Sequence, residues 1–278
     1  MCAAKQPIVL YDRSEAPGKP FVGTPTAPER QPVAGALSII VPAYNEEQRL
    51  RSTVEAVLVA AAAALDRYEV IIVNDGSNDG TRVIADELAA ANVSVIHHAV
   101  NRGVGAAYRS GLQAARFPFV SLVPGDNAFD PACLAAFFAL VGRADIIISY
   151  RENVSARSPV RRVLSVIFST LLRFATRLPI RDGHSLYIWP VDLARQIPVP
   201  DDYRYHMTTL AALLQKVSSY AETPVQLTPR PDASSRVLRP RVVIGSGWTM
   251  LKIMLQNRLI WRPPAPLPRA VSLGEKPP

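Results

Sequence analysis

The chain has 278 residues, 49% of them hydrophobic and 19% charged, so it can bury a sizeable core and disorder throughout is excluded. A formal net charge of +8 and a pI near 9.8 favour anionic partners: a phosphorylated substrate, an anionic membrane surface or nucleic acid. No stretch reaches the roughly 18 uninterrupted apolar residues of a spanning helix. The two cysteines, Cys2 and Cys133, have no paired spacing, so a reducing compartment is the default. We expect a cytoplasmic protein, either soluble or peripheral on the cytoplasmic face of a membrane.

The first segment is rich in proline and lacks the apolar run of a secretory signal. We expect residues 1–36 to be an extended arm. Residues 37–235 are predicted to form one domain, and residues 236–278 a basic and apolar C-terminal segment that ends in a frayed tail.

From Leu37 onward, short β-branched runs alternate with helical patterns, which is typical of a parallel sheet wound by helices. The predicted strands are Ser38–Pro42, Glu69–Val73, Val93–His97, Phe119–Val123 and Asp145–Ser149. The predicted helices are Leu50–Leu65, Thr81–Ala91, Gly105–Ala115 and Pro131–Val141. Asn45 is expected to cap the first helix, with Gln48 in the capping-box position. Because ligands bind at the carboxyl ends of strands in such sheets, the loops there should converge on one cleft.

The first two of these loops carry groups suited to a nucleoside. The first loop, Pro42-Ala43-Tyr44-Asn45-Glu46, combines a rigid turn, an aromatic ring that can pack on a base or ribose, and a carboxylate that can accept from hydroxyls. The second strand is followed by Asp75, to which a nucleobase N–H can donate. Turn chemistry alone explains either loop, so the evidence for a nucleoside site comes from the spacing between the two loops.

The third loop contains Arg102, Gly103 and Gly105, and its backbone N–H groups can approach a diphosphate at a helix N-terminus. It also imitates a dinucleotide fingerprint, with Asp126 as the ribose acid. Tyr108 stands at the third glycine position, however, and the loop follows the third strand rather than the first. These two departures argue against an oxidoreductase.

The fourth loop, Pro124-Gly125-Asp126, places a carboxylate after an apolar strand, where it can hold a divalent cation on a diphosphate. A single carboxylate permits such a site without being diagnostic of one. The four histidines are expected to have structural or surface roles rather than to bind metal.

Arginines dominate the region after Arg151, interleaved with aliphatic residues as in a basic amphipathic helix. A structural role, in which the helix faces a partner or packs on the core with solvated arginines, is as consistent with this pattern as a role in binding an anionic ligand. Together with Trp248 and Trp261 it suggests attachment to an anionic membrane surface.

Taken together, the Val-Pro-Ala-Tyr-Asn-Glu, Asn-Asp-Gly-Ser-x-Asp-Gly-Thr and Asn-Arg-Gly-x-Gly-x-Ala loops and the fourth-strand Asp resemble glycosyltransferase family 2. Order and spacing match from Ser38 to about Asp126, and a weaker match continues to about Val225. The later segment is similar to the polyprenyl-phosphate sugar synthases. Its matching residues are Arg151, an Arg-x-x-x-Ser pair at Arg161 and Ser165, and an Asp-x-x-Ser turn at Asp182 and Ser185.

This resemblance implies an α/β fold of the GT-A type, Rossmann-like, with a mainly parallel sheet flanked by helices. It implies that the nucleotide-sugar pocket comprises Pro42, Ala43, Tyr44, Glu46, Asp75, Arg102, Gly103, Gly125 and Asp126. Asp126 would hold a divalent cation, Mg²⁺ or Mn²⁺, and would be catalytic together with Arg151. The acceptor phosphate would be bound by Arg151, Arg161 and Arg162.

The chain departs from the family pattern at four positions. Pro124 replaces the first carboxylate of an Asp-x-Asp motif, and Ala128 stands where a polar ligand often helps the metal. Leu186 replaces a usual glycine, and Thr208 lies near the place of a usual acid. These departures bear on metal use and turnover rather than on the fold.

The expected function is an inverting transfer of sugar from a nucleoside-diphosphate sugar to an acceptor. A phosphate monoester, with a second pKa of about 6, is already largely ionised at neutral pH and needs no general base. A polyprenyl phosphate therefore suits a chain without an obvious extra acid. The alternative is a nucleotide-sugar-binding protein with weakened or lost catalysis. Nucleic acid is not an expected partner, because the basic residues lack a known binding motif or an aromatic stacking platform.

Overall fold

The computed structural model describes residues 8–12, 35–126, 129–151, 180–182, 185–202, 204–226 and 271–273, with positions 166, 167, 169, 170 and 173 between them. The strands are β1 Ile8–Asp12, β2 Ala36–Ala43, β3 Arg67–Asn74, β4 Val93–His97, β5 Phe119–Leu122, β6 Ile146–Arg151, β7 Tyr187–Pro190, β8 Ser219–Val225 and β9 Val271–Leu273. The helices are α1 Leu50–Ala64, α2 Thr81–Glu87, α3 Val104–Ala114, α4 Pro131–Phe138, α6 Val191–Arg195 and α7 Tyr205–Leu213.

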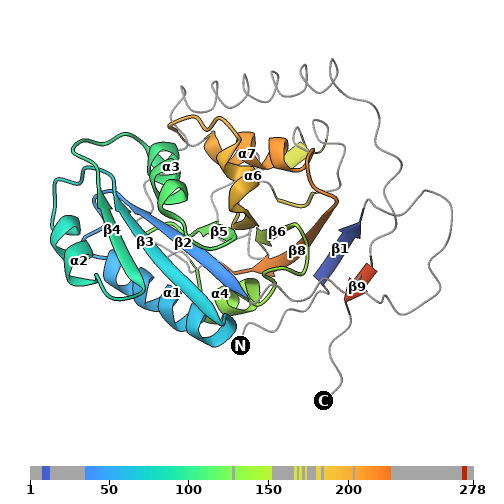
Figure 1. Cartoon of the computed structure of the whole chain (residues 1–278), viewed down its shortest axis with the longest axis horizontal. Helices are drawn as coiled ribbons and strands as arrows, with labels where there is room; N and C mark the ends of the chain where they lie inside the picture. The colour runs from blue at the N-terminus through green and yellow to red at the C-terminus, as the bar shows by residue number, and fades with distance from the viewer. Residues whose placement is uncertain are drawn as a thin grey trace.

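All of these strands belong to one mainly parallel sheet, in the order β4-β3-β2-β5-β7-β6-β8-β1-β9 (Figure 1). β4, β3, β2 and β5 are parallel to their neighbours, and β6 is parallel to β8. β7 runs antiparallel to both β5 and β6, which leaves those two strands parallel to each other. The carboxyl ends of β2 to β6 and of β8 therefore share one edge of the sheet, here called the carboxyl edge. This architecture confirms the predicted α/β class.

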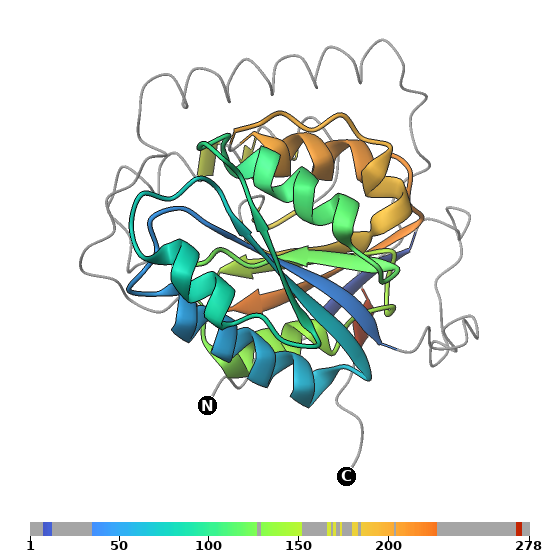
Figure 2. The same ribbon diagram turned by 60° about the vertical axis from the view of Figure 1, so that its left-hand side comes forward.

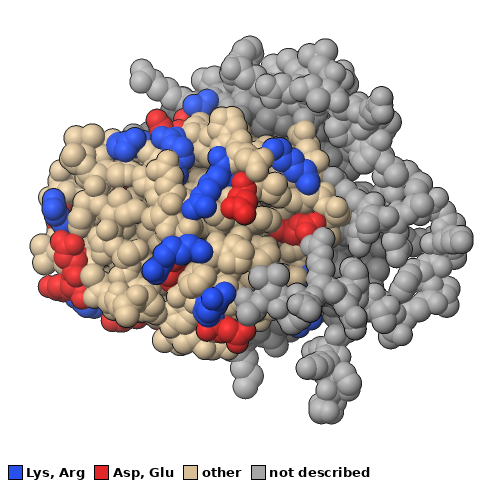
Figure 3. All heavy atoms as spheres, viewed as in Figure 1, with Lys and Arg blue, Asp and Glu red and all other residues tan. Residues whose placement is uncertain are grey.

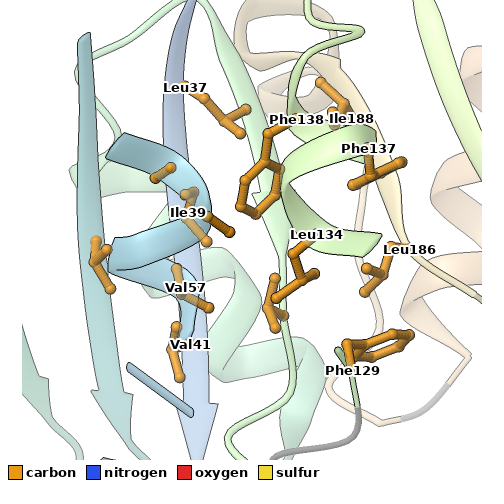
Figure 4. Close-up of a cluster of buried hydrophobic side chains, with 14 of the residues drawn as sticks. Leu37, Ile39, Val41, Val57, Phe129, Leu134, Phe137, Phe138, Leu186 and Ile188 are labelled. Carbon is orange, nitrogen blue, oxygen red and sulfur yellow. The ribbon is translucent and has the colours of Figure 1, made fainter. Parts of the chain in front are cut away.

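Helices cover both faces of the sheet (Figure 2). Leu37, Ile39 and Val41 of β2 point toward α1 and α4, where Phe137 and Phe138 fill the layer (Figure 4). α3, α6 and α7 cover the opposite face, onto which Ile40, Ile71 and Ile148 project. Residues that alternate along a strand thus serve two separate cores, as period-two side-chain geometry requires.

One glycine lets α3 approach the sheet closely. A Cβ added at Gly111 would lie 2.6 Å from the side chain of Ile40 on β2. Any larger residue at this position would push α3 away from β2. The start of α3, which faces the carboxyl edge, is therefore held at a fixed distance from the sheet.

The predicted strands and helices of residues 38–149 are all present, and α1, α2 and α4 end earlier than predicted. α2 stops at Glu87 because the backbones of Ala90 and Val93 pair with each other in an isolated bridge, which a continuing helix would not allow. The sequence analysis did not identify β7 and β8. β7 has four residues, and β8 contains a glutamate and a proline, so neither has the usual strand pattern.

The capping prediction for α1 is wrong. The residue that precedes the helix is Arg49, and no side chain caps it. Asn45 lies four residues earlier with φ at +56°, in the left-handed region that asparagine tolerates, and its side chain bonds to the second loop instead.

Part of the expected N-terminal arm joins the sheet. β1 pairs antiparallel with β8 and with β9, so residues 8–12 and 271–273 extend the far side of the sheet. Of the expected arm, Ala36 is the first residue of β2, whereas residues 1–7 and 13–34 lie outside the described residues. The rest of the C-terminal segment, with Trp248 and Trp261, lies outside them as well. Among the described helices none has the length and apolarity needed to cross a membrane.

Candidate functional site

The first and second loops are tied together by hydrogen bonds at the carboxyl edge. The amide of Asn45 donates to Oγ of Ser77 at 3.0 Å, and the amide of Asn78 donates to Oδ1 of Asn45 at 2.9 Å. The amide of Glu46 donates to Oγ1 of Thr81 at 2.8 Å. Asn45 is therefore a link between two loops, which explains why it does not cap α1.

A carboxylate from each loop completes this connection. Glu47 accepts from the amide of Gly80 at 2.8 Å, and Asp79 accepts from the amide of Glu47 at 3.3 Å. Within its own loop Asp79 also accepts from the amide and hydroxyl of Thr81. Burial disfavours the charged form of Asp79, but the hydrogen bonds from Thr81 and from the amide of Glu47 outweigh burial and lower its pKa. The two loops thus form one rigid unit beside the ends of β2 and β3.

Asp75, at the end of β3, is buried and holds the third loop. Its Oδ1 accepts from the amide of Arg102 at 2.9 Å, and its Oδ2 accepts from the amide of Gly103 at 2.8 Å. Gly103 has φ at +93°, a backbone conformation that side-chain-bearing residues rarely adopt. The structure thus brings the predicted residues Asp75, Arg102 and Gly103 together. Arg102 takes part in these contacts through its backbone amide.

The end of β2 connects the second and fourth loops. The carbonyl of Ala43 accepts from the amide of Asp75 at 2.9 Å, and the carbonyl of Pro42 accepts from the amide of Gly125 at 3.1 Å. A Cβ added at Gly125 would lie 2.9 Å from that carbonyl, so the glycine permits the close approach. Asp126 follows directly and is half-buried. Two predicted acids, Asp75 and Asp126, therefore flank the end of β2.

A metal ion would have few protein ligands at this edge. Within the described part of the chain, no group of three or more His, Cys, Asp or Glu side chains is placed to hold a cation. Magnesium and manganese keep several waters and use one or two carboxylates plus substrate phosphates. Asp126 fits an ion that arrives with a diphosphate, rather than an ion held by protein alone.

Arg151, at the end of β6, is in a buried ion pair with Asp182. Its Nε lies 2.5 Å from Oδ2 and its Nη2 lies 2.8 Å from Oδ1, and both residues are 8% exposed. The guanidinium predicted to bind an acceptor phosphate thus already has a bidentate carboxylate partner. Arg161 and Arg162, predicted for the same role, lie outside the described residues.

The predicted Asp-x-x-Ser turn is held from two strands. Ser149 of β6 donates to Oγ of Ser185 at 2.6 Å and accepts from the amide of Leu186 at 2.7 Å. Glu222 of β8 accepts from the amide of Arg181 at 2.8 Å. Glu222 is fully buried, and burial raises its pKa to about 7. The sequence analysis did not single out Glu222, although a lone acid inside an apolar strand is a usable signal.

The segment before α7 closes one side of the third loop. The amide of Gly105 donates to the carbonyl of Asp201 at 2.8 Å, and Arg109 donates to the carbonyl of Val199 at 2.7 Å while pairing with Asp201. A Cβ at Gly105 would lie 1.9 Å from the carbonyl of Pro200, so only glycine fits there. The start of α7, and with it Thr208, is thereby brought near the third loop.

A pocket of about 390 Å³ opens beside this segment, lined by Pro198, Val199, Pro200, Arg204 and Thr208. Arg204 on its wall is paired with Asp202. On the face seen in Figure 3, basic side chains alternate with acidic ones over the described residues rather than forming a continuous strip.

The two described histidines at the end of β4 have structural partners, as the sequence indicated. His97 contacts Asn74 at 3.1 Å and Asp86 at 2.9 Å. His98 contacts Asp75, which is a predicted site residue. The sequence analysis missed this contact because the two residues lie 23 positions apart.

Comparisons with known proteins agree with this geometry. The fold is that of glucosyl-3-phosphoglycerate synthase from Mycobacterium tuberculosis, solved with Mn²⁺, uridine diphosphate and phosphoglyceric acid. The TM-score is 0.63 over 79% of this chain and 78% of that one, at 16% sequence identity. The class defined by fold and site is therefore a GT-A-type α/β protein.

The family follows from the sequence match. Residues 38–188, more than half of the chain, match the model of glycosyl transferase family 2. The chain belongs to glycosyltransferase family 2, as its loops predicted.

Curated relatives include polyprenyl-phosphate sugar synthases. Dodecaprenyl-phosphate galacturonate synthase of Rhizobium johnstonii is 29% identical over 58% of this chain and 49% of the relative. Dolichyl-phosphate beta-glucosyltransferase ALG5A of Trichomonas vaginalis is 31% identical over 54% of this chain and 51% of the relative. The chain spans about half the length of the curated relatives it matches.

Proposed function

We propose that this chain transfers a sugar from a nucleoside-diphosphate sugar to an acceptor by inverting displacement. The observation that carries the proposal is the joining of four loops at the carboxyl edge, with Asp75 and Asp126 on either side of the end of β2. Membership of glycosyltransferase family 2 supports this reaction class. The solved relatives of the same fold bind uridine diphosphate.

The nucleotide would lie across the end of β2. In this proposal Tyr44 and Glu46 contact the base or ribose, and Asp75 accepts from a nucleobase N–H. Pro42, Ala43 and Gly125 form the floor, where backbone approaches backbone closely. Arg102 and Gly103 lie beside the diphosphate, with the start of α3 directed at it.

A divalent cation would be held by Asp126 together with the diphosphate. Such an ion would neutralise charge that develops on the departing nucleoside diphosphate. The chain contributes one carboxylate and a fixed backbone at Gly125. The rest of its contribution is positioning of donor and acceptor, and preorganised charge, the usual sources of catalysis in such displacements.

The acceptor in this proposal is a polyprenyl phosphate. The names of the relatives support a polyprenyl phosphate. Thr208 lies near the place where a carboxylate would act as a general base, and a phosphate acceptor needs no such base. An ionised phosphate oxygen attacks the anomeric carbon directly as the bond to the diphosphate breaks. Arg151, Arg161 and Arg162 are the proposed acceptor contacts; Arg151 would share its charge with Asp182 in that role.

Such a lipid acceptor would be met at a membrane surface. We extend the proposal to peripheral attachment through the basic helix after Arg151 and residues 236–278, beside a catalytic domain of residues 37–235. Sedimentation with anionic liposomes at low salt tests this part. Failure to sediment would remove the membrane attachment without affecting the transfer reaction.

A second candidate function is nucleotide-sugar binding without turnover. Pro124 favours it, because this residue removes one carboxylate from the place where a cation is usually held. The two functions differ in a direct assay with labelled nucleotide sugars, polyprenyl phosphate and Mn²⁺ or Mg²⁺. Label moving to the lipid supports the transferase, whereas tight binding with neither transfer nor hydrolysis under any cation supports the binding protein.

A further inference from the structure

The buried side chain of His98 connects α3 to Asp75. Its Nδ1 lies 2.6 Å from Oδ1 of Asp75, and its Nε2 lies 2.9 Å from Oγ of Ser110. The side chains of His98 and Asp75 are each 5% exposed. Since a carboxylate only accepts hydrogen bonds, Nδ1 must carry a proton, and Ser110 donates to Nε2 when the ring is neutral.

The order serine, histidine and aspartate is that of a catalytic triad, but the surroundings differ. Ser110 lies in the interior of α3, where the backbone amides are used in the helix. Its own turn therefore offers no pair of amides to stabilise an oxyanion, which acyl transfer requires. The chain of hydrogen bonds supports Asp75 rather than activating Ser110.

The acceptor capacity of Asp75 shows what His98 contributes. Each carboxylate oxygen can accept about two hydrogen bonds. Oδ1 accepts from His98 and from the amide of Arg102, and Oδ2 accepts from the amide of Gly103. One acceptor position therefore remains on Oδ2. Without His98, only two neighbouring amides of the third loop would fix the rotation of the carboxylate.

We propose that His98 is a positioning residue of the nucleotide pocket: it fixes Asp75 so that Oδ1 is used within the protein and Oδ2 is kept for an N–H of the nucleobase. This inference rests on the proposed function, since it takes Asp75 as a ligand of the base. It also makes a claim about the protein alone, namely that His98 keeps the amides of Arg102 and Gly103 bonded to Asp75.

Three substitutions of His98 distinguish the role of Nδ1, which contacts Asp75, from that of Nε2, which contacts Ser110. His98→Asn keeps a donor close to the place of Nδ1 but does not reach Ser110. His98→Gln places its donor near Nε2, away from Asp75, and His98→Leu removes both contacts. Loss of a hydrogen bond to a charged group weakens affinity by about tenfold or more. We expect the Kd for uridine diphosphate to change by less than about threefold in His98→Asn and to rise by about tenfold or more in the other two.

Asp86→Asn is the matched control. It removes the charged partner of the neighbouring His97, in a pair of the same type, but Asp86 lies on α2 with 57% of its side chain exposed. Its affinity for uridine diphosphate should equal that of the wild type. If His98→Leu fails to fold, comparing the uridine diphosphate affinities of His98→Asn and His98→Gln still tests the proposal. Equal affinities in these two variants would overturn it.

Amide hydrogen exchange gives a readout that needs no ligand. The amides of Arg102 and Gly103 should exchange faster in His98→Leu and His98→Gln than in the wild type, and unchanged exchange would contradict the proposal. If the wild-type protein binds no nucleoside diphosphate, the proposed function fails, while the exchange result still tests the role of His98. If it binds and all His98 variants bind equally, only the inference about His98 fails.

Discussion

Oε1 of Glu222 accepts a hydrogen bond from the amide of Arg181 at 2.8 Å, which joins the interior of β8 to the turn that contains Asp182. Glu222 has no exposed surface, and Nε of Arg181 lies 3.8 Å from its Oε2. A fully buried acid is costly to ionise, and here burial outweighs the favourable contacts with Arg181. The contact therefore orders the turn while making the stability of the protein depend on pH.

Burial raises the pKa of Glu222 from its ordinary value of 4.5 to about 7. Below about pH 4.5 the group is protonated in both the folded and the unfolded state and has no linkage effect. As pH rises toward 7, the unfolded state ionises first, so the folded state loses on the order of 3 kcal/mol. Glu222→Gln keeps an oxygen for the amide of Arg181 and should raise the free energy of unfolding at pH 8 but much less at pH 5. Urea denaturation at both pH values measures this, and an equal change at both would contradict the pKa shift.

The ion pair of Arg151 and Asp182 should be strongly coupled. Asp182→Leu leaves a buried guanidinium without its partner and is expected to cost roughly 3–5 kcal/mol of unfolding free energy, and Arg151→Met is the second single variant. The double variant Arg151→Met, Asp182→Leu should recover much of that loss, because it removes both charges. Thermal and urea denaturation of the two single variants and the double variant form the cycle. Additive losses would show that the two side chains do not depend on each other.

Gly103 should tolerate no side chain. Its φ is +93°, and an added Cβ would lie 2.4 Å from the carbonyl of Asp201. Gly103→Ala is therefore expected to displace the third loop from Asp75 and to weaken uridine diphosphate binding by about tenfold or more, since both strain and a hydrogen bond are involved. Gly35→Ala is the matched control, because the nearest atom to its added Cβ is 3.6 Å away. Normal affinity in Gly103→Ala would mean that the third loop does not contact the nucleotide.

Asp126 is predicted to make nucleotide binding depend on a cation. In the wild type, Mn²⁺ should tighten uridine diphosphate binding and EDTA should abolish transfer, whereas in Asp126→Ala the affinity should no longer respond to Mn²⁺. Asp130→Asn is a suitable comparison, since Asp130 caps α4 through the amides of Ala132 and Cys133. It should cost at most about 1 kcal/mol of stability and keep the response to Mn²⁺. A full Mn²⁺ response in Asp126→Ala would place the cation elsewhere.

Local sequence patterns predicted the first half of the fold well, because its strands and helices have strong periodicity and are separated by Gly, Asn and Asp. The end of α2 was harder to predict, because the pairing of Ala90 with Val93 depends on backbone geometry rather than on composition. Asn45 shows the same limitation. Its sequence position suits a helix cap, but its partners Ser77 and Asn78 come from a loop more than 30 positions away.

The candidate site was predictable as a set of loops but not as a network. Asp75, Gly103, Gly125 and Asp126 were singled out because each lies in a loop that follows a strand. The roles of His98 and Glu222 depend on contacts with Asp75 and Arg181, 23 and 41 positions away, and no local pattern reports such contacts. For Arg151 the sequence indicated a cationic contact, and the structure adds that its charge is shared with Asp182.

The measurement that tests the central claim most directly is calorimetric titration of the wild-type protein with nucleoside diphosphates, with and without Mn²⁺ or Mg²⁺. The claim is that the carboxyl edge of the sheet is a nucleotide-sugar pocket. It predicts saturable binding of at least one nucleoside diphosphate with one site per chain, together with a higher melting temperature, and weakened binding in Asp75→Ala. No binding of any nucleoside diphosphate under any of these conditions would contradict it.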